Sequence, residues 1–116
     1  MTTTNKTLTI KNYRHNREVD SEESNTTRVK IAVAPAAGEK LNAKGMELAA
    51  KHAAIAAFEL AASFLRQIPP GCSYCLPEVH SGETWAGGAS AFVTFDHDGV
   101  PVAISAVETA VEQARK

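Results

Sequence analysis

The sequence has little cysteine, almost no excess of charge and no long apolar run, and each shortage argues against a class of protein. Its 116 residues include two cysteines and carry a formal net charge of −1. Two cysteines in a chain with no export signal are expected to be reduced thiols rather than a disulfide framework. The balanced charge disfavours a general nucleic-acid binder, which usually carries concentrated positive charge, and equally an acidic mimic of DNA.

The apolar residues do not gather into a membrane span. No run of about 18 apolar residues occurs, and the first residues, MTTTNKTLTI, lack the basic region and apolar core of a signal peptide. An apolar fraction of 44% and a charged fraction of 22% are typical of a soluble globular protein. We therefore expect a single cytoplasmic domain over residues 1–116, with no membrane contact.

Alternation of apolar and polar residues predicts two strands in the first third of the chain. It occurs in residues 6–13, KTLTIKNY, and again in residues 27–34, TRVKIAVA. Residues 14–26 between them are polar, charged and nearly free of apolar side chains, which predicts a flexible charged loop. The residues of the second strand that should face the core are Val29, Ile31 and Val33.

The strongest pattern in the sequence is that of an alanine-rich helix. The segment LNAKGMELAAKHAAIAAFELAASFLRQI ends at Pro69-Pro70-Gly71, which predicts a helix from about 40 to 67. Asn42 can cap its first turn by accepting a hydrogen bond from a backbone amide. Small side chains on one face let the helix approach a sheet closely. That face carries Met46, Ala50, Ala53, Ala57, Leu60, Phe64 and Ile68.

A second hairpin and a short helix are expected after residue 88. Residues 89–95, ASAFVTF, and 100–104, VPVAI, suit two strands, and the Asp-Gly pair within residues 97–99 suits a hairpin turn. Ser105 and Glu108 then form a capping box for the helix. The order of elements is ββαββα. The sequence therefore predicts an α+β fold, with a small antiparallel sheet of about four strands on one long helix and a short C-terminal helix.

The segment 69–88 has the composition of a long functional loop. It holds both cysteines and the only tryptophan, and loops of this length are uncommon in so small a domain. Tyr74 and Trp85, with His80 between them, are candidate partner-binding residues because aromatic side chains concentrate binding energy at interfaces. The alternative is that Trp85 closes the end of the core and the loop only wraps the helix.

Chemistry in this loop is weakly indicated. Cys72, Cys75 and His80 make at most part of a zinc ligand set. A thioredoxin-like CxxC opens a helix, whereas Leu76-Pro77 follows here. The sequence offers no nucleophile and base with an orienting partner, and no phosphate cradle. We therefore expect no enzyme activity, no cofactor and no metal, with a small zinc-binding domain kept as an alternative.

Leu48 and Ile55 lie one heptad apart among the charged residues of the long helix, away from its sheet-facing stripe. Either the C-terminal helix covers them through Val107 and Val111, or they are exposed and bind a partner or a second copy of the chain. Burying such a side chain is worth about 1.5–3 kcal/mol, enough to support a modest association. Both residues are therefore candidate partner-binding residues.

Nucleic-acid binding by the first hairpin is an alternative function. Basic strand faces can follow a phosphate backbone, although acidic residues share the connecting loop. Binding assays at two salt concentrations separate this alternative from protein binding, since phosphate contacts weaken steeply with salt. The basic residues concerned are Lys11, Arg14, Arg17, Arg28 and Lys30.

The chain resembles a known group in plan but not in motif. The alanine-rich helix MELAAKHAAIAAFELAA, short hairpin strands and lack of a cofactor motif resemble small phage-encoded inhibitors of bacterial defence, such as anti-CRISPR proteins. The resemblance implies a viral protein that blocks a larger bacterial complex by stoichiometric binding, and it assigns no residue. Residues 89–115 are more distantly similar to HicB-type antitoxin domains, whose motif residues they lack. The favoured hypothesis is a non-enzymatic protein-binding module.

Overall fold

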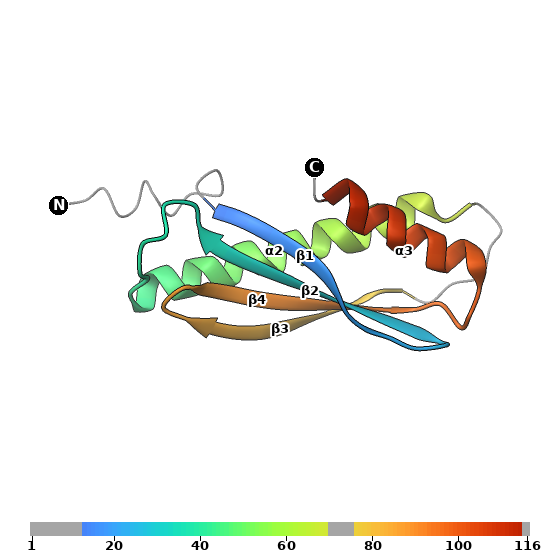
Figure 1. The fold of residues 1–116 in the computed structure, drawn as a ribbon, viewed down its shortest axis with the longest axis horizontal. Coiled ribbons are helices and arrows are strands. Elements are labelled where there is room, and N and C mark those ends of the chain that lie inside the picture. The colour runs from blue at the N-terminus through green and yellow to red at the C-terminus, as the bar shows by residue number, and fades with distance from the viewer. Residues whose placement is uncertain (1–12, 70–75, 115–116) are drawn as a thin grey trace.

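The computed structural model describes residues 13–69 and 76–114. Within these ranges a four-stranded antiparallel sheet and two helices follow one another in the order ββαββα (Figure 1). The strands are β1 (Tyr13–Glu22), β2 (Thr26–Pro35), β3 (Glu78–Trp85) and β4 (Gly88–Asp96), and the helices are α2 (Ala43–Gln67) and α3 (Pro101–Ala114). The α+β class, the number of strands and the order of elements predicted from the sequence are confirmed.

The two hairpins join through their second strands. The order across the sheet is β1-β2-β4-β3, so β2 and β4 are central and β1 and β3 are edges. Ile31 of β2 pairs with Ala91 of β4 near the middle of the sheet. Both helices lie on one face of the sheet, and no described element covers the other face (Figure 1).

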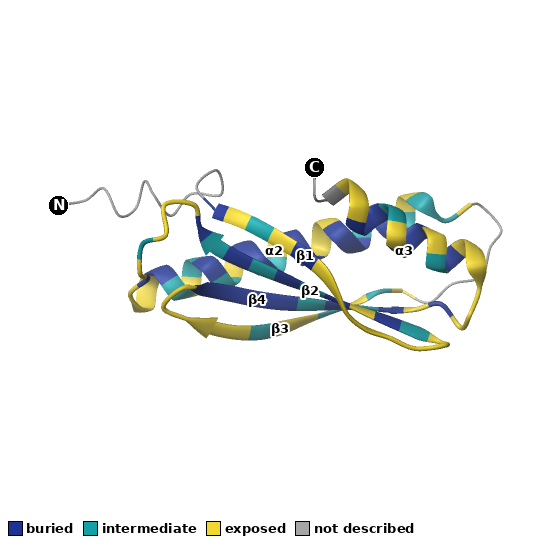
Figure 2. Ribbon diagram, viewed as in Figure 1, coloured by how far each residue is buried: buried dark blue, intermediate teal, exposed yellow. Residues whose placement is uncertain are grey.

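The core lies between the central strands and α2, because alternate residues of β2 and β4 are apolar and face the helix (Figure 2). Val29, Ile31 and Val33 are fully buried, as predicted. The rings of Phe64 and Phe95 pack with centroids 4.8 Å apart, tilted by 47°. The members of the predicted α2 stripe that are fully buried are Ala53, Ala57, Leu60 and Phe64. The alanines thus allow the close helix–sheet contact that the sequence predicted.

The start of α2 follows the predicted capping chemistry. The side-chain oxygen of Asn42 accepts a hydrogen bond from the backbone amide of Gly45 at 2.8 Å, and Asn42 itself is extended. This bond satisfies one of the amides that a helix leaves without a partner in its first turn. At the other end Ile68 turns extended before Pro69, as expected from the residue before a proline pair.

The position of β1 corrects two predictions, the strand at residues 6–13 and the flexible loop at residues 14–26. Residues 6–12 lie outside the described residues, and segment 14–26, expected to be a flexible charged loop, forms most of β1, its turn and the first residue of β2. β1 pairs along its length with β2, so that His15 lies opposite Val33 and Arg17 opposite Ile31. Pairing with a strongly apolar neighbour thus imposes strand structure on a polar segment whose own composition predicts none.

The long segment 69–88 is also corrected, because it contains β3. Residues 78–85 pair with β4 in an antiparallel hairpin. The sequence EVHSGETW has only one aliphatic residue, Val79, on the side that faces α2, so the pattern of alternating apolar residues is missing. β3 is a strand because β4, which is strongly apolar, pairs with it on both sides of the register shift between Ser81 and Thr84.

The last predicted strand, 100–104, is instead the start of α3. Asp98 and Gly99 both adopt positive φ angles of 51° and 72°, but they connect a strand to a helix and not to a second strand. Pro101 begins the helix, where a missing backbone N–H costs nothing. Ser105 is therefore an exposed residue inside the helix and not its cap. Val107, Ala110 and Val111 form a buried apolar stripe on α3.

The length and composition of α2 alone would allow it to cross a membrane, and it is the one helix among the described residues of which this is true. Half of its most apolar stretch is buried against the rest of the domain. The core helix of a soluble protein shows the same combination of length, apolar composition and burial.

Candidate partner-binding surface

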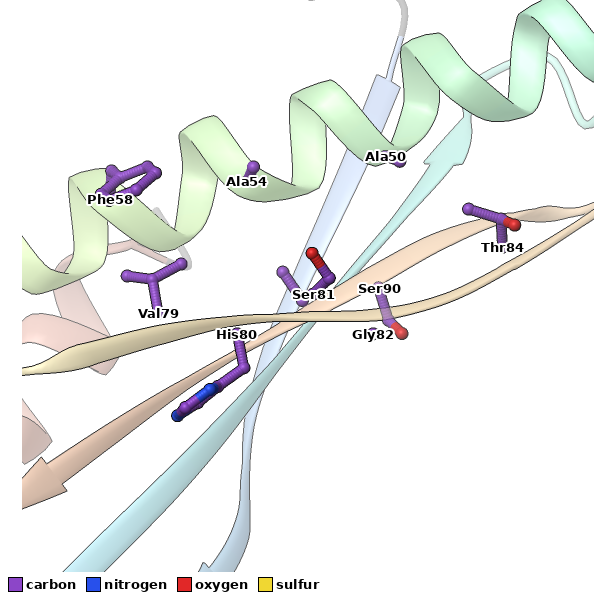
Figure 3. Close-up of a pocket in the computed structure, with 10 residues that line it drawn as sticks. Ala50, Ala54, Phe58, Val79, His80, Ser81, Gly82, Thr84 and Ser90 are labelled. Carbon is purple, nitrogen blue, oxygen red and sulfur yellow. The ribbon is translucent and has the colours of Figure 1, made fainter.

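A groove lies between α2 and the edge strand β3 (Figure 3). It encloses about 280 Å³ and is bordered at its inner end by Ser90 and Ala91 of β4. Ala50, Ala54 and Phe58 line it from the helix, and residues 79–82 with Thr84 line it from the strand. The walls are mostly apolar carbon, and the polar side chains among them, three hydroxyl residues and His80, come from the strands.

The groove exists because small residues face one another across this seam. β2 and β4 direct valine, isoleucine and phenylalanine side chains at α2, whereas β3 directs Ser81 at the alanines Ala50 and Ala54. Atoms that line a void lose the dispersion contacts they would have in a filled core. A side chain from another molecule would restore those contacts, so the groove is a natural place for an apolar anchor.

A β-bulge fixes the shape of the strand wall. The pairing of β3 with β4 shifts between Ser81 and Thr84, so β3 carries one extra residue there. The backbone amide of Glu83 donates a hydrogen bond to Oγ of Ser90 at 3.0 Å. A side chain on Gly82 would place its Cβ 2.7 Å from the carbonyl oxygen of Ser90, so only glycine fits this close approach.

Phe58 is the most conspicuous exposed side chain of α2. It is 63% exposed at the rim of the groove, and Ile55, one turn before it, is 42% exposed. Residues three apart on a helix are neighbours, so the two form one exposed apolar patch on α2, of which Phe58 also lines the groove. Sequence reasoning missed Phe58, although its position one heptad after Lys51 placed it on the charged side of the helix, where a phenylalanine needs an explanation.

The predicted residues of segment 69–88 separate in the structure. Trp85 ends β3 with 43% of its surface exposed, so it does not close the core. Its ring lies over the β3–β4 turn, where a Cβ on Gly87 would come within 2.7 Å of the indole nitrogen. His80 points away from α2 (Figure 3), with Nε2 3.6 Å from a carboxylate oxygen of Glu78. Tyr74 lies outside the described residues.

The two helix candidates also separate. Leu48 is half-buried against the core, and Ile55 is exposed. α3 packs beside the C-terminal half of α2, where Gln113 accepts hydrogen bonds from Ser63 and Gln67, each at 3.5 Å. The two candidates therefore do not form one exposed patch, and α3 leaves Ile55 uncovered.

The basic residues proposed for nucleic-acid contact have different surroundings. Arg17 is buried, with a guanidinium nitrogen 3.8 Å from a carboxylate oxygen of Glu59, so it does not face solvent phosphate. Arg28 lies 3.6 Å from a carboxylate oxygen of Asp20 and 3.9 Å above the centre of the Phe92 ring. Lys11 lies outside the described residues.

Arg14 and Lys30 share the uncovered sheet face with Arg28, but acidic residues share it too. Pairing places Glu18 opposite Lys30, and Glu78 lies on the same face of β3. These carboxylates offset the basic charges, so the face offers no continuous positive track of the kind that phosphate backbones bind.

A polar cluster fills the space between β1 and α2 on the other side of the helix from the groove. The rings of Tyr13 and His52 lie 4.5 Å apart. Burial, together with the Glu39 carboxylate, raises the pKa of Tyr13. Burial also lowers the pKa of His15, helped by the nearby positive charge of Arg17. The cluster fills the seam with long side chains where the β3 side is left open.

His97 ties the last strand to the turn before α3. It is buried, its Nδ1 accepts a hydrogen bond from the amide of Gly99 at 3.2 Å, and its Nε2 lies 2.8 Å from Oγ1 of Thr27. An accepting Nδ1 carries no proton, so Nε2 is the donor to Thr27. His97 therefore connects β2 and β4 to the turn before α3.

The described parts of the chain contain no group of three or more histidine, cysteine or acidic residues placed to hold a metal ion. Cys72 and Cys75 lie outside these parts, so the weak zinc hypothesis stays a prediction. The arrangement of the described residues suggests contact chemistry, with an apolar groove, an exposed aromatic residue and a strand edge on one side of the domain.

Comparison of this chain with protein-family models, with curated proteins and with solved structures finds no significant match.

Proposed function

We propose that the protein is a non-enzymatic protein-binding module that binds its partner through the α2–β3 surface, defined as the groove with Phe58 at its rim and the exposed Ile55 one turn before it on α2. The observation that carries the proposal is the exposed Phe58 beside an unfilled apolar groove. Burying a phenylalanine is worth about 1.5–3 kcal/mol. A folded protein that leaves this side chain in water beside a groove has the features of an anchor with its pocket.

The proposed partner is a larger bacterial complex, which the protein would block by stoichiometric binding in the cytoplasm. This part of the proposal is supported by the resemblance in plan to phage-encoded inhibitors. It is consistent with a surface that offers an apolar groove and an exposed aromatic side chain as contact groups.

A capture experiment tests the proposal. The wild-type protein, a Phe58→Asp variant and a matched Lys51→Asp variant on the same side of α2 are immobilised and exposed to bacterial lysate. We expect a protein retained by the wild type and by Lys51→Asp, and at least a tenfold loss with Phe58→Asp. Trp85→Ala should weaken binding by about 2 kcal/mol if Trp85 belongs to the contact. Thermal melts of every variant exclude unfolding as the cause.

The proposal is wrong if all folded variants retain the same protein equally, because the contact then lies elsewhere. If the protein converts a purified partner to a product, its function is catalysis and the proposal is also wrong.

Nucleic-acid binding through the uncovered sheet face remains the second candidate. Its supporting observation is Phe92 beneath Arg28 and paired with Lys30, which places an aromatic ring between two basic residues. An Arg14/Arg28/Lys30 triple alanine variant would lose salt-dependent nucleic-acid binding in this case, while Phe58→Asp would keep it.

A further inference from the structure

We infer that the partner contributes an extended segment that adds to the sheet as a strand beside β3, with alternate apolar side chains in the groove and basic side chains on the other face. This inference rests on the proposed function and specifies how the α2–β3 surface is used. Three features of the described residues carry it: the strand edge, the alternation of faces along β3, and the charge of that edge.

The first feature is the unpaired edge. β3 pairs with β4 on one side, and no other described strand pairs with it. An edge strand carries a row of backbone N–H and C=O groups ready to pair with another chain. Strand addition to such an edge is a recurrent mode of peptide recognition, in which main-chain hydrogen bonds give affinity and side-chain pockets give specificity.

The second feature is the difference between the two faces of β3. Val79, Ser81 and Thr84 lie opposite inward-facing residues of β4 and border the groove. Glu78 and His80 lie on the uncovered face. Since successive residues of a strand face opposite sides, an added strand would place every second side chain between α2 and β3, where Ala50, Ala54 and Phe58 already form an apolar wall.

The third feature is the charge of the edge. β3 carries two carboxylates, Glu78 and Glu83, and no lysine or arginine. The Glu78 side chain is 74% exposed, with His80 as its neighbour at 3.6 Å. Opposite charges on neighbouring strands stabilise a sheet by about 0.2–1 kcal/mol per pair, so the favoured segment alternates apolar residues with lysine or arginine.

Synthetic peptides test the inference on the whole protein. The probe is a blocked hexapeptide that alternates lysine and valine. One control replaces lysine with glutamate, and a second keeps the sequence but carries N-methyl groups on the amides that would pair with β3. Binding is followed by NMR titration, and amide hydrogen exchange is measured along β3. We expect the lysine peptide to bind at least tenfold more tightly than either control, and to slow exchange of β3 amides.

Matched variants locate the site. Ala54→Leu should fill the groove and weaken the lysine peptide at least tenfold, whereas Ala62→Leu, two turns further along α2, should not. A Glu78→Lys/Glu83→Lys double variant should reverse the preference and favour the glutamate peptide. Each variant is first shown to keep the wild-type melting temperature within a few degrees.

The outcomes separate this inference from the proposed function. If Phe58→Asp abolishes capture of the cellular partner while the N-methylated peptide binds as well as the lysine peptide, the protein binds through this surface but not by strand addition. If neither peptide binds and Phe58→Asp captures normally, both are wrong. A concentration-dependent dimer that dissociates in the Glu78→Lys/Glu83→Lys variant would identify a second copy of the chain as the occupant and overturn the assignment to a separate partner.

Discussion

The two edge strands of the sheet differ in what stands between them and α2. β1 directs His15 and Arg17 toward the helix, and the Tyr13 and His52 rings pack beside them, so that seam is filled. β3 directs Ser81 and Thr84 toward the same helix, and that seam is left as a groove of about 280 Å³. Both strands are polar in sequence. Polarity alone therefore does not decide which edge is sealed: long side chains fill the β1 seam, and short side chains line the groove beside β3.

The two edge strands also differ in how readily they can pair with a strand from another molecule. A charged side chain that points inward, such as Arg17, protects an edge because a paired strand would have to accommodate it. β1 also has a bulge between Val19 and Ser21 and is close to α3. β3 has a bulge as well, at Gly82, but no inward-pointing charge. Of the two edges, β3 is therefore the better candidate for strand addition.

The largest expected effect contrasts filled and unfilled positions on α2. Ala57→Leu should destabilise the protein by about 2–3 kcal/mol, because Ala57 is fully buried and a larger side chain overpacks the helix–sheet seam. Ala53→Leu should behave in the same way. Ala54→Leu should leave stability unchanged or raise it, since the groove has room for the added atoms.

Chemical denaturation measures these differences, with Lys51→Leu as the solvent-facing control. Equal losses for Ala54→Leu and Ala57→Leu would show that the groove is not open in solution, and the contrast between the two edges would then fail.

A second prediction tests whether β1 is sealed by packing or by charge. Arg17→Ala should cost about 2 kcal/mol, because about three buried methylene groups at about 0.8 kcal/mol each lose their contacts. Arg17→Met should recover most of the loss, since Glu59 is largely exposed and needs no partner. Ser81→Ala on the open β3 side should change stability by less than about 0.5 kcal/mol.

Urea unfolding of the three variants provides the measurement. If Arg17→Met is as damaging as Arg17→Ala, the ion pair with Glu59 rather than packing holds the β1 seam.

The fold could be predicted from sequence where the pattern was local. α2 has a capping asparagine, a helical period and a proline stop, and β2 has strict alternation, so each was placed within a few residues. β1 and β3 could not be placed, because their strand structure comes from pairing with β2 and β4 and not from their own residues. Residues 100–104 show the reverse error, since β-branched residues and an Asp-Gly turn indicated a strand where Pro101 begins a helix.

The candidate surface was predicted only in part. Ile55 and Trp85 are exposed as expected for contact residues, but the groove depends on β3 lying beside α2, which no local pattern revealed. Phe58 was missed although the helical period places it on the charged side of α2, because only Leu48 and Ile55 were considered among the apolar residues of that side. Arg17 was mistaken for a solvent-facing base because its partner on α2, Glu59, lies 42 residues further along the chain.

A smaller effect is expected from pH and concerns the sealed edge. In the folded protein the pKa of His15 is lowered, mainly by burial and then by the positive charge of Arg17. The Glu59 carboxylate acts in the opposite direction, and His52 makes a further lowering contribution. The unfolded chain then takes up a proton at higher pH than the folded chain. Stability should therefore fall as pH drops below about 6.5, the unperturbed value for histidine, and become level below the folded pKa.

Comparison of wild type with His15→Asn isolates this contribution from the other histidines. The difference in unfolding free energy between the two should change across that pH range. A difference that is constant from pH 7 to pH 5 would show that His15 is as well solvated in the folded state as in the unfolded one.

The smallest expected effect on stability is at the open edge, and it is the one that most sharpens the contrast. Phe58→Ala should change the unfolding free energy by less than about 0.5 kcal/mol, because a side chain that is 63% exposed has few contacts to lose. The same variant should lose at least tenfold in partner binding if Phe58 is an anchor. Lys51→Ala controls for a general change on this face of α2 and should alter neither quantity.

Unfolding in urea and binding to the captured partner are measured on the same preparations. A stability loss of about 2 kcal/mol for Phe58→Ala would mean that the ring already fills the groove in the free protein, and the β3 edge would then be sealed in the same way as β1.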